Sequence, residues 1–215
     1  MDIIDKLAEI FKEFPGIGER QARRFVYFLM SRTNGYTENL SSLILDLKKD
    51  ISQCKECFRF FLRRPNRVGV PTASVGNKIC EICSDKNMDS SILMIVEKDS
   101  DLESVKKSRI YNGKYFILGG LVPIVEKNTK NRVRIEELKQ KISKDENPNK
   151  LREIILAFSL SPQGDHTDSY IREQLKDTAE KSGIKISSLG KGLSTGTELE
   201  YSDNDTLKNA LKNRQ

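Results

Sequence analysis

Apolar residues recur at helical spacing in three segments near the N-terminus. The segments are Ile4, Leu7, Ala8 and Phe11; then Ala22, Phe25, Val26 and Leu29; then Leu40, Leu43, Ile44, Leu47 and Ile51. Because this spacing puts apolar side chains on one helical face, it predicts three amphipathic helices. The first two are separated by Phe14-Pro15-Gly16-Ile17-Gly18, which favours a tight turn. The N-terminal region is therefore expected to be a small helical bundle with a helix-hairpin-helix unit.

From Ser90 onward, short continuous apolar runs alternate with amphipathic segments. The runs predict strands at 92–96, 115–118, 154–158 and 184–189, and the segments predict helices after Ser100, at 135–142 and at 167–181. Ser100 and Glu103 match a capping box at the start of the first of these helices. Strands separated by helices imply a largely parallel sheet with both faces covered, so the fold class is multidomain α/β. A strand at 197–201 and a short helix at 205–211 are expected in the tail.

The composition is that of a globular chain with a surplus of basic residues. Of the 215 residues, 37% are hydrophobic and 32% are charged, and the formal net charge is +6. No stretch is long and apolar enough to span a membrane, and no export signal is evident, so a cytoplasmic location is expected. A surplus this modest suits a polyanionic partner without requiring one, so the distribution of the basic residues matters more.

All four cysteines belong to two Cys-x-x-Cys steps, Cys54-Lys55-Glu56-Cys57 and Cys80-Glu81-Ile82-Cys83. Four thiolates can surround a zinc ion and leave no position for a substrate water, so Zn²⁺ bound here would be structural. The alternatives are two disulfides or unrelated thiols, and a reducing cytoplasm favours zinc over both. The stretch between the steps is somewhat longer than usual, and the one histidine, His166, lies far away in sequence.

The predicted hairpin is a candidate DNA-binding site. Gly16 and Gly18 allow a tight turn whose amides can point at a phosphate, next to the positive end of a helix dipole. Arg20, Arg23 and Arg24 follow on the next helix and add cations beside that anion site. Such a site binds the nucleic-acid backbone rather than a base sequence. The alternative is an ordinary helix connection with a solvated basic face.

A second basic cluster lies between the cysteine pairs, where phenylalanines and arginines are interleaved. Its members are Phe58, Arg59, Phe60, Phe61, Arg63, Arg64 and Arg67. Aromatic side chains among arginines can stack on unpaired bases. We favour the simpler interpretation, in which the phenylalanines form a small core around the metal and the arginines point to water.

The carboxyl edge of the predicted sheet has few acidic residues. Glu97 ends the first strand of the α/β unit, where acidic side chains often reach a ligand. A two-metal phosphoryl-transfer site would need further carboxylates after the third strand, but Ser159, Ser161 and Gln163 stand there. Glu97 and Asp165 remain as ligand candidates, and catalysis is not expected.

Several motifs occur in one order over nearly the whole chain. They are residues 14–18 with Arg20 and Arg24, the four cysteines, Val96-Glu97-Lys98 with Asp101, residues 115–120 with Pro123, Gly192 with Gly196, and residues 198–201 leading into Thr206-Leu207 and Ala210-Leu211. In this order they resemble the RecR family of bacterial recombination mediators. The last motif is the most specific to that family.

The resemblance implies four parts: a helix-hairpin-helix domain at 1–52, a four-cysteine zinc finger at 53–88, a Toprim α/β domain at 89–190 and a C-terminal extension at 191–215. It also implies a homo-dimer or ring-like tetramer that binds single- and double-stranded DNA without sequence preference, in the cytoplasm at the nucleoid. RecO, and in many bacteria RecF, would be its partners in loading the RecA recombinase onto single strands. Arg20 and Arg24 fall at DNA-contacting positions, and Glu97, Asp101 and Asp165 fall in the Toprim region linked to partner binding.

Three features depart from the family pattern. The segment between the cysteine pairs is long, Gln163 stands where the family commonly has a glutamate, and the stretch after Pro123 lacks a glycine-proline loop.

The predicted function is a non-enzymatic DNA-binding recombination mediator. One alternative is a Toprim-type metal-dependent phosphotransferase or nuclease, against which Ser159, Ser161 and Gln163 argue. Another is a zinc-dependent RNA-binding or structural protein.

Overall fold

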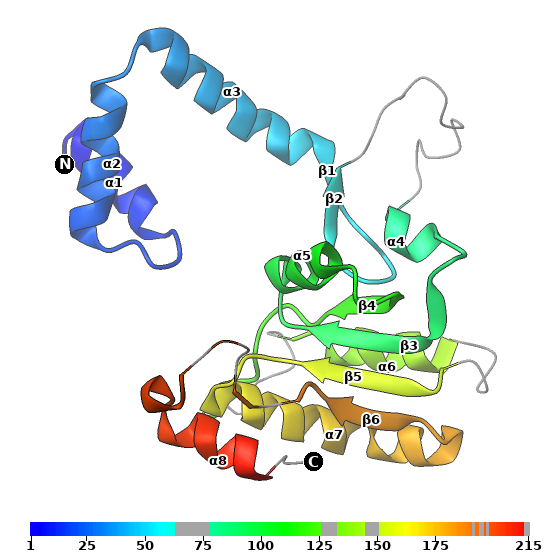
Figure 1. Ribbon diagram of the computed structural model, residues 1–215. Coiled ribbons are helices and arrows are strands. Elements are labelled where there is room, and N and C mark those ends of the chain that lie inside the picture. The colour runs from blue at the N-terminus through cyan, green and yellow to red at the C-terminus, as the bar shows by residue number, and fades with distance from the viewer. Residues whose placement is uncertain are drawn as a thin grey trace. The chain divides into compact units, whose positions relative to one another are not determined.

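The computed structural model describes residues 1–62, 78–125, 133–144, 151–190, 192–193, 196 and 198–212. The chain divides into two compact units, Met1–Ile51 and Ser52–Gln215. The first unit is helical, and the second contains a four-stranded sheet with helices around it (Figure 1). The predicted multidomain α/β fold class is therefore confirmed. Within the described residues, no helix is long and apolar enough to cross a membrane.

The helical unit consists of α1 (Ile3–Lys12), α2 (Glu19–Met30) and α3 (Asn34–Asp50), as the apolar spacing predicted. Its core lies between α1 and α2, and every residue of α3 is exposed or half-buried. The core residues are Ala8, Ala22 and Val26, with Ile4, Leu7, Phe11 and Ile17 packed against them. Small alanines at the centre allow the two helices to approach closely, and this fixes the hairpin between them.

The sheet is parallel throughout, with strand order β4-β3-β5-β6. Its strands are β3 (Asp89–Val96), β4 (Gly113–Ile117), β5 (Glu153–Ala157) and β6 (Lys185–Ser188), close to the four predicted runs. In the centre of the sheet, Met94 of β3 lies opposite Tyr115 of β4 and Ile155 of β5. The chain order reverses between β3 and β5, and the carboxyl edge at such a point is where open α/β sheets bind ligands.

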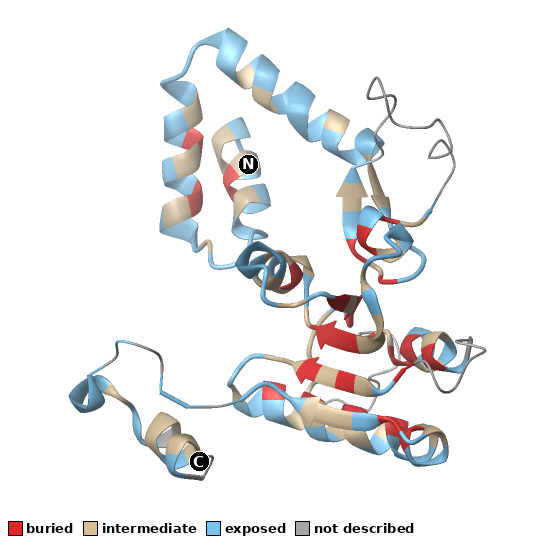
Figure 2. Ribbon diagram, turned by 45° about the vertical axis from the view of Figure 1, so that its right-hand side comes forward, coloured by how far each residue is buried: buried red, intermediate tan, exposed pale blue. Residues whose placement is uncertain are grey.

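Helices cover both faces of the sheet because successive residues of a buried strand point to opposite sides. Leu93 and Ile95 pack in one core cluster with residues of α6 (Ile135–Lys144) and α7 (Pro162–Ser182). Met94 and Val96 pack in another with Leu102 of α5 (Asp99–Ser108). Figure 2 shows the buried residues gathered in the strands and on the helix faces turned toward them.

Two local predictions are wrong. The helix α5 has Lys98 as its N-cap, and the Asp101 carboxylate accepts a hydrogen bond from the Lys98 amide at 3.2 Å. The helix thus begins before the predicted pair, Ser100 and Glu103. In the tail, Leu199–Tyr201 forms a 3₁₀ helix rather than a strand. The expected terminal helix is present as α8 (Asn204–Lys212).

Candidate metal centre and nucleic-acid interface

The four cysteines converge on one site. Cys54 and Cys57 lie in the turn between β1 (Ile51–Gln53) and β2 (Phe60–Leu62). Cys80 is the N-cap of the short helix α4 (Glu81–Ser84), and Cys83 lies within that helix. Their Sγ atoms lie within 4.8 Å of one another, and all four are free thiols. Ligands of a tetrahedral zinc ion lie about 3.8 Å apart when each Zn–S bond is about 2.3 Å. The predicted clustering is confirmed, and its size is compatible with a metal ion.

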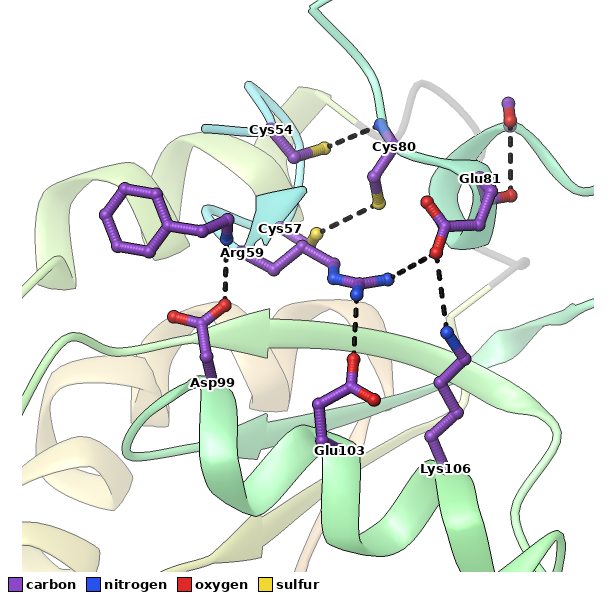
Figure 3. Close-up of polar contacts among 10 residues, drawn as sticks. Cys54, Cys57, Arg59, Cys80, Glu81, Asp99, Glu103 and Lys106 are labelled. Carbon is purple, nitrogen blue, oxygen red and sulfur yellow. Dashed lines mark hydrogen bonds and ion pairs between the residues drawn. The ribbon is translucent and has the colours of Figure 1, made fainter. Parts of the chain in front are cut away.

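The chemistry of the thiols also fits a divalent cation. The Cys54 Sγ accepts a hydrogen bond from the Glu56 amide at 3.4 Å. It accepts another from the Cys80 amide at 3.3 Å (Figure 3). Hydrogen bonds from the Cys57, Cys80 and Cys83 thiols lower the pKa of Cys54, whereas sharing a proton with Cys54 raises the pKa of Cys57. The pKa of Cys80 is also lowered, to about 7, whereas the neighbouring thiols and burial raise the pKa of Cys57 and Cys83. A bound cation would replace the protons that remain and offset the burial of the negative charge.

Arg59 joins this site to the α/β sheet, and the expectation that it points to water is wrong. Its guanidinium is 9% exposed and lies 2.8 Å from both Glu81 Oε1 on α4 and Glu103 Oε1 on α5 (Figure 3). The neighbouring Phe60 amide donates to the Asp99 carboxylate at 2.8 Å. The other arginines of this cluster, Arg63, Arg64 and Arg67, lie outside the described residues.

Further contacts pack the cysteine site onto strand β4. The Ile117 amide donates to the Cys57 carbonyl at 2.9 Å, and the Lys114 ammonium donates to the carbonyls of Ile82 and Asp85. Three of the cysteines belong to the same buried cluster as Met94, Val96 and Tyr115. The expected phenylalanine core is only partly present: Phe61 packs against this cluster, Phe58 stacks edge-on against Phe116 of the sheet, and Phe60 is 53% exposed.

The hairpin between α1 and α2 has the backbone form that the glycines suggested. Gly16 has a φ of +78°, a left-handed conformation that disfavours other residues. Gly18 is the N-cap of α2, and because it has no side chain, the first turn of that helix has no side-chain cap. The amides of such a first turn are donors to an external acceptor, and the helix dipole favours an anion there.

The three hairpin arginines differ in their partners. Arg23 lies 3.1 Å from the Asp5 carboxylate and 3.8 Å from that of Glu19, so its charge is offset inside the hairpin. Arg24 donates to the Gln21 side chain at 3.3 Å. In the part of the chain that the structure describes, Arg20 and Arg24 have no ion-pair partner. Both are exposed.

The acidic residues at the carboxyl edge are dispersed. Glu97 follows β3 and lies 3.9 Å from the Lys98 ammonium, while Asp101 is engaged at the start of α5. Asp165 is exposed in the first turn of α7 and lines a small pocket with Ser159 and other residues. Among the described residues, the four cysteines form the one group of three or more metal-ligating side chains, so these carboxylates are not gathered into such a group.

Comparisons with known proteins identify the family. A model of the Toprim domain matches residues 91–190, and a model of the RecR C-terminal region matches residues 192–215. Recombination protein RecR of Lactobacillus acidophilus is 30% identical over 98% of this chain and 96% of its own length. Recombination protein RecR of Bacteroides thetaiotaomicron is 31% identical over 99% and 93%. The chain belongs to the RecR family.

As a RecR-family member, the chain is a recombination protein, and its four-stranded sheet belongs to a Toprim domain. The resemblance to the RecR family that the motifs indicated is confirmed. The clustering of its four cysteines was predicted from their spacing alone. The ion pairs of Arg59 with Glu81 and Glu103 were missed, because the three residues are far apart in sequence and no local spacing signals that they meet. The different pairing of Arg23 was missed for the same reason.

Proposed function

We propose that this chain is a non-enzymatic recombination mediator whose hairpin binds the DNA backbone without sequence preference. The observation that carries the proposal is the uncapped start of α2 beside Arg20 and Arg24, which lack ion-pair partners among the described residues. Gly16 and Gly18 shape the turn. Arg23 also belongs to the proposed DNA-binding surface, but its charge is partly offset by Asp5. Single- and double-stranded DNA both present the phosphates that such a site would bind.

We further propose that the metal is Zn²⁺, held by Cys54, Cys57, Cys80 and Cys83. When bound, the ion would supply folding energy rather than chemistry, because four thiolate ligands leave no open coordination position. The burial of three of the four cysteines supports this structural role. We also propose that the boundaries between the four parts of the chain lie at 52/53, 88/89 and 190/191.

The partner we propose is a RecO-like protein, joined by a RecF-like protein where one exists, and the joint task is loading a recombinase onto single-stranded DNA. Glu97, Asp101 and Asp165, all at the carboxyl edge of the Toprim sheet, are the proposed partner-binding residues. The working form is a homo-dimer or tetramer in the cytoplasm, associated with the nucleoid. The names of the relatives and their similarity over the full length of the chain support this role.

The proposal of a non-enzyme rests on the residues after β5. Ser159, Ser161 and Gln163 supply hydroxyl and amide groups where a two-metal phosphotransferase or nuclease would need carboxylates. Ser161 caps α7 by accepting a hydrogen bond from the Gly164 amide at 3.1 Å, which is a structural use of its hydroxyl. Sustained magnesium-dependent cleavage or synthesis by the purified protein would favour the enzymatic alternative instead.

The deciding experiment replaces Arg20 and Arg24 together by alanine and measures binding to single-stranded, duplex and RNA oligonucleotides over a range of salt concentrations. We expect weaker binding and a salt slope shallower by about one unit per lost phosphate contact. Arg23→Ala is the matched control on the same helix, and it should change the slope less because Asp5 already offsets that charge. Unchanged affinity and slope in the double variant would remove the hairpin from the interface.

A further inference from the structure

The exposed face of α2 carries aromatic rings as well as cations. Opposite the buried stripe, this face presents Arg20, Arg23, Arg24, Tyr27 and Phe28, all of them exposed. Phe28 follows Arg24 by one helical turn, so the two side chains lie on neighbouring parts of one surface. Tyr27 and Phe28 are 55% and 43% exposed. Large exposed rings on the polar face of a helix offer a surface for a ligand.

Three side chains at the end of this helix form a cluster, which we call the Phe28–Arg32–Tyr36 cluster. The Arg32 guanidinium lies 4.2 Å from the centroid of the Phe28 ring and 5.8 Å from that of the Tyr36 ring. The two rings are 6.1 Å apart and nearly perpendicular, at 82°. Arg32 has no carboxylate partner among the described residues. Its charge is therefore available to an external anion while its flat face is held by the rings.

The backbone around the cluster is ordered by local hydrogen bonds. The Arg32 amide donates to the Leu29 carbonyl at 3.1 Å at the end of α2, and the Tyr36 amide donates to the Thr33 carbonyl at 3.0 Å as α3 begins. Phe28 and Tyr36 are each 43% exposed, so ring surface remains open although the ring positions are set by their contacts. A preformed aromatic surface loses little conformational entropy when a flat ligand stacks on it.

We propose that the Phe28–Arg32–Tyr36 cluster stacks unpaired bases of a single-stranded nucleic acid whose phosphates lie along Arg20 and Arg24. The inference rests on the proposed DNA-binding function of the hairpin and adds a preference for single strands. Aromatic rings next to arginine are the groups that bind unpaired bases regardless of sequence. In a duplex the base faces are covered by their neighbours, so the cluster could gain little there. The nearby cations complement a phosphate backbone rather than an apolar partner surface.

Affinity measurements on paired variants test the proposal. Phe28→Leu and Tyr36→Leu remove the rings but keep apolar bulk, and each should weaken binding to a single-stranded oligothymidylate by about fivefold or more. Duplex affinity should stay within about twofold, since duplex binding uses the phosphate contacts alone. Met30→Ala is the matched control, because Met30 is 63% exposed on the same helix and has no ring. Phe28→Tyr keeps an aromatic ring and should retain the single-strand affinity that Phe28→Leu loses.

A fluorescent reporter gives a second, independent readout. The chain contains no tryptophan, so Phe28→Trp places the sole tryptophan of the variant at the proposed site. Its emission should be quenched by the oligothymidylate and much less by an abasic strand of equal length and charge. Met30→Trp should show little quenching with either strand.

Several outcomes would overturn the inference. Equal losses of single-strand and duplex affinity in the leucine variants would assign the rings to folding, and unchanged affinity would remove them from the interface. Quenching of Phe28→Trp by the abasic strand would mean that the bases are not stacked. A change in the mass of the assembly in Phe28→Leu, with DNA affinity intact, would assign the cluster to contact between copies. If the wild-type protein binds no polynucleotide, the proposed function itself fails, which is distinct from all of these results.

Discussion

Arg24 and Arg59 both stand next to phenylalanine in a basic stretch of the sequence, yet they lie in opposite environments. Arg24 is exposed on α2 and donates to a glutamine, whereas Arg59 is buried and paired with two carboxylates. An exposed arginine retains its charge for a phosphate, while a buried pair is satisfied internally and acts on stability. Two arginines with similar sequence neighbourhoods therefore differ in role: Arg59 is held within the fold, whereas Arg24 is left for the proposed DNA contact.

The largest effect is expected from removal of the proposed metal ion. Because three of its proposed ligands belong to a buried cluster with residues of the sheet, chelation should lower the stability of the Ser52–Gln215 unit by several kcal/mol. Thermal unfolding with and without added zinc measures this, and hydrogen exchange locates it. The Ile117 amide, which donates to Cys57, should lose protection, whereas the amides of α1 and α2 should keep theirs. A metal-free preparation that melts unchanged would contradict the structural role of the ion.

The next effect tests Arg59 directly. Arg59→Met leaves Glu81 and Glu103 without their shared cation, and because these carboxylates are 59% and 42% exposed, we expect a loss of about 2 kcal/mol rather than the larger cost of a fully buried pair. Denaturant unfolding measures the change, and DNA affinity should not change. Lys106→Met, which removes the exposed 3.4 Å partner of Glu81, is the control and should cost at most about 0.5 kcal/mol. Equal losses of unfolding free energy in the two variants would mean that the burial of Arg59 does not strengthen its contribution to stability.

The hairpin glycine has a smaller effect, confined to the first unit. Gly16→Ala forces a side chain into a left-handed backbone and should destabilise the helical unit by about 1 kcal/mol, with weaker DNA binding. Thermal unfolding and an oligonucleotide titration measure the two consequences. Gly35→Ala, in the helical backbone of α3 with open space around it, should leave both unchanged or slightly stabilise the helix. Normal DNA binding by a destabilised Gly16→Ala would separate the turn geometry from the interface.

The smallest effect on stability is expected from Arg24. Arg24→Ala removes an exposed side chain with one hydrogen bond to Gln21, so the free energy of unfolding should change by less than about 0.5 kcal/mol. Denaturant unfolding of this variant and of Arg59→Met gives two free energies of unfolding to compare, since each variant lacks one arginine. A loss as large as that of Arg59→Met would erase the distinction between the two environments.

The elements that could be predicted from sequence are those with a strong local pattern. The strands of the Toprim sheet follow from continuous apolar runs, and the first two helices from repeats of apolar residues around a proline-glycine turn. The elements that were missed, β1, β2 and α4, are short, and their bounds depend on the convergence of the cysteines rather than on periodicity. The start of α5 was misplaced because the N-cap is Lys98 and its amide donates to Asp101, whereas the prediction paired Ser100 with Glu103.

By itself, the sequence determined the order of the longer helices and of the sheet strands, the parallel α/β class, the clustering of the four cysteines and the glycine turn of the hairpin. Each of these depends on residues close together in the chain, where spacing and backbone preference act directly. Only the tertiary structure decided that Arg59 is buried between Glu81 and Glu103, that Asp5 offsets Arg23, and that Phe28, Arg32 and Tyr36 meet. The environment of a charge depends on groups brought together by folding, and neighbours in sequence do not specify them.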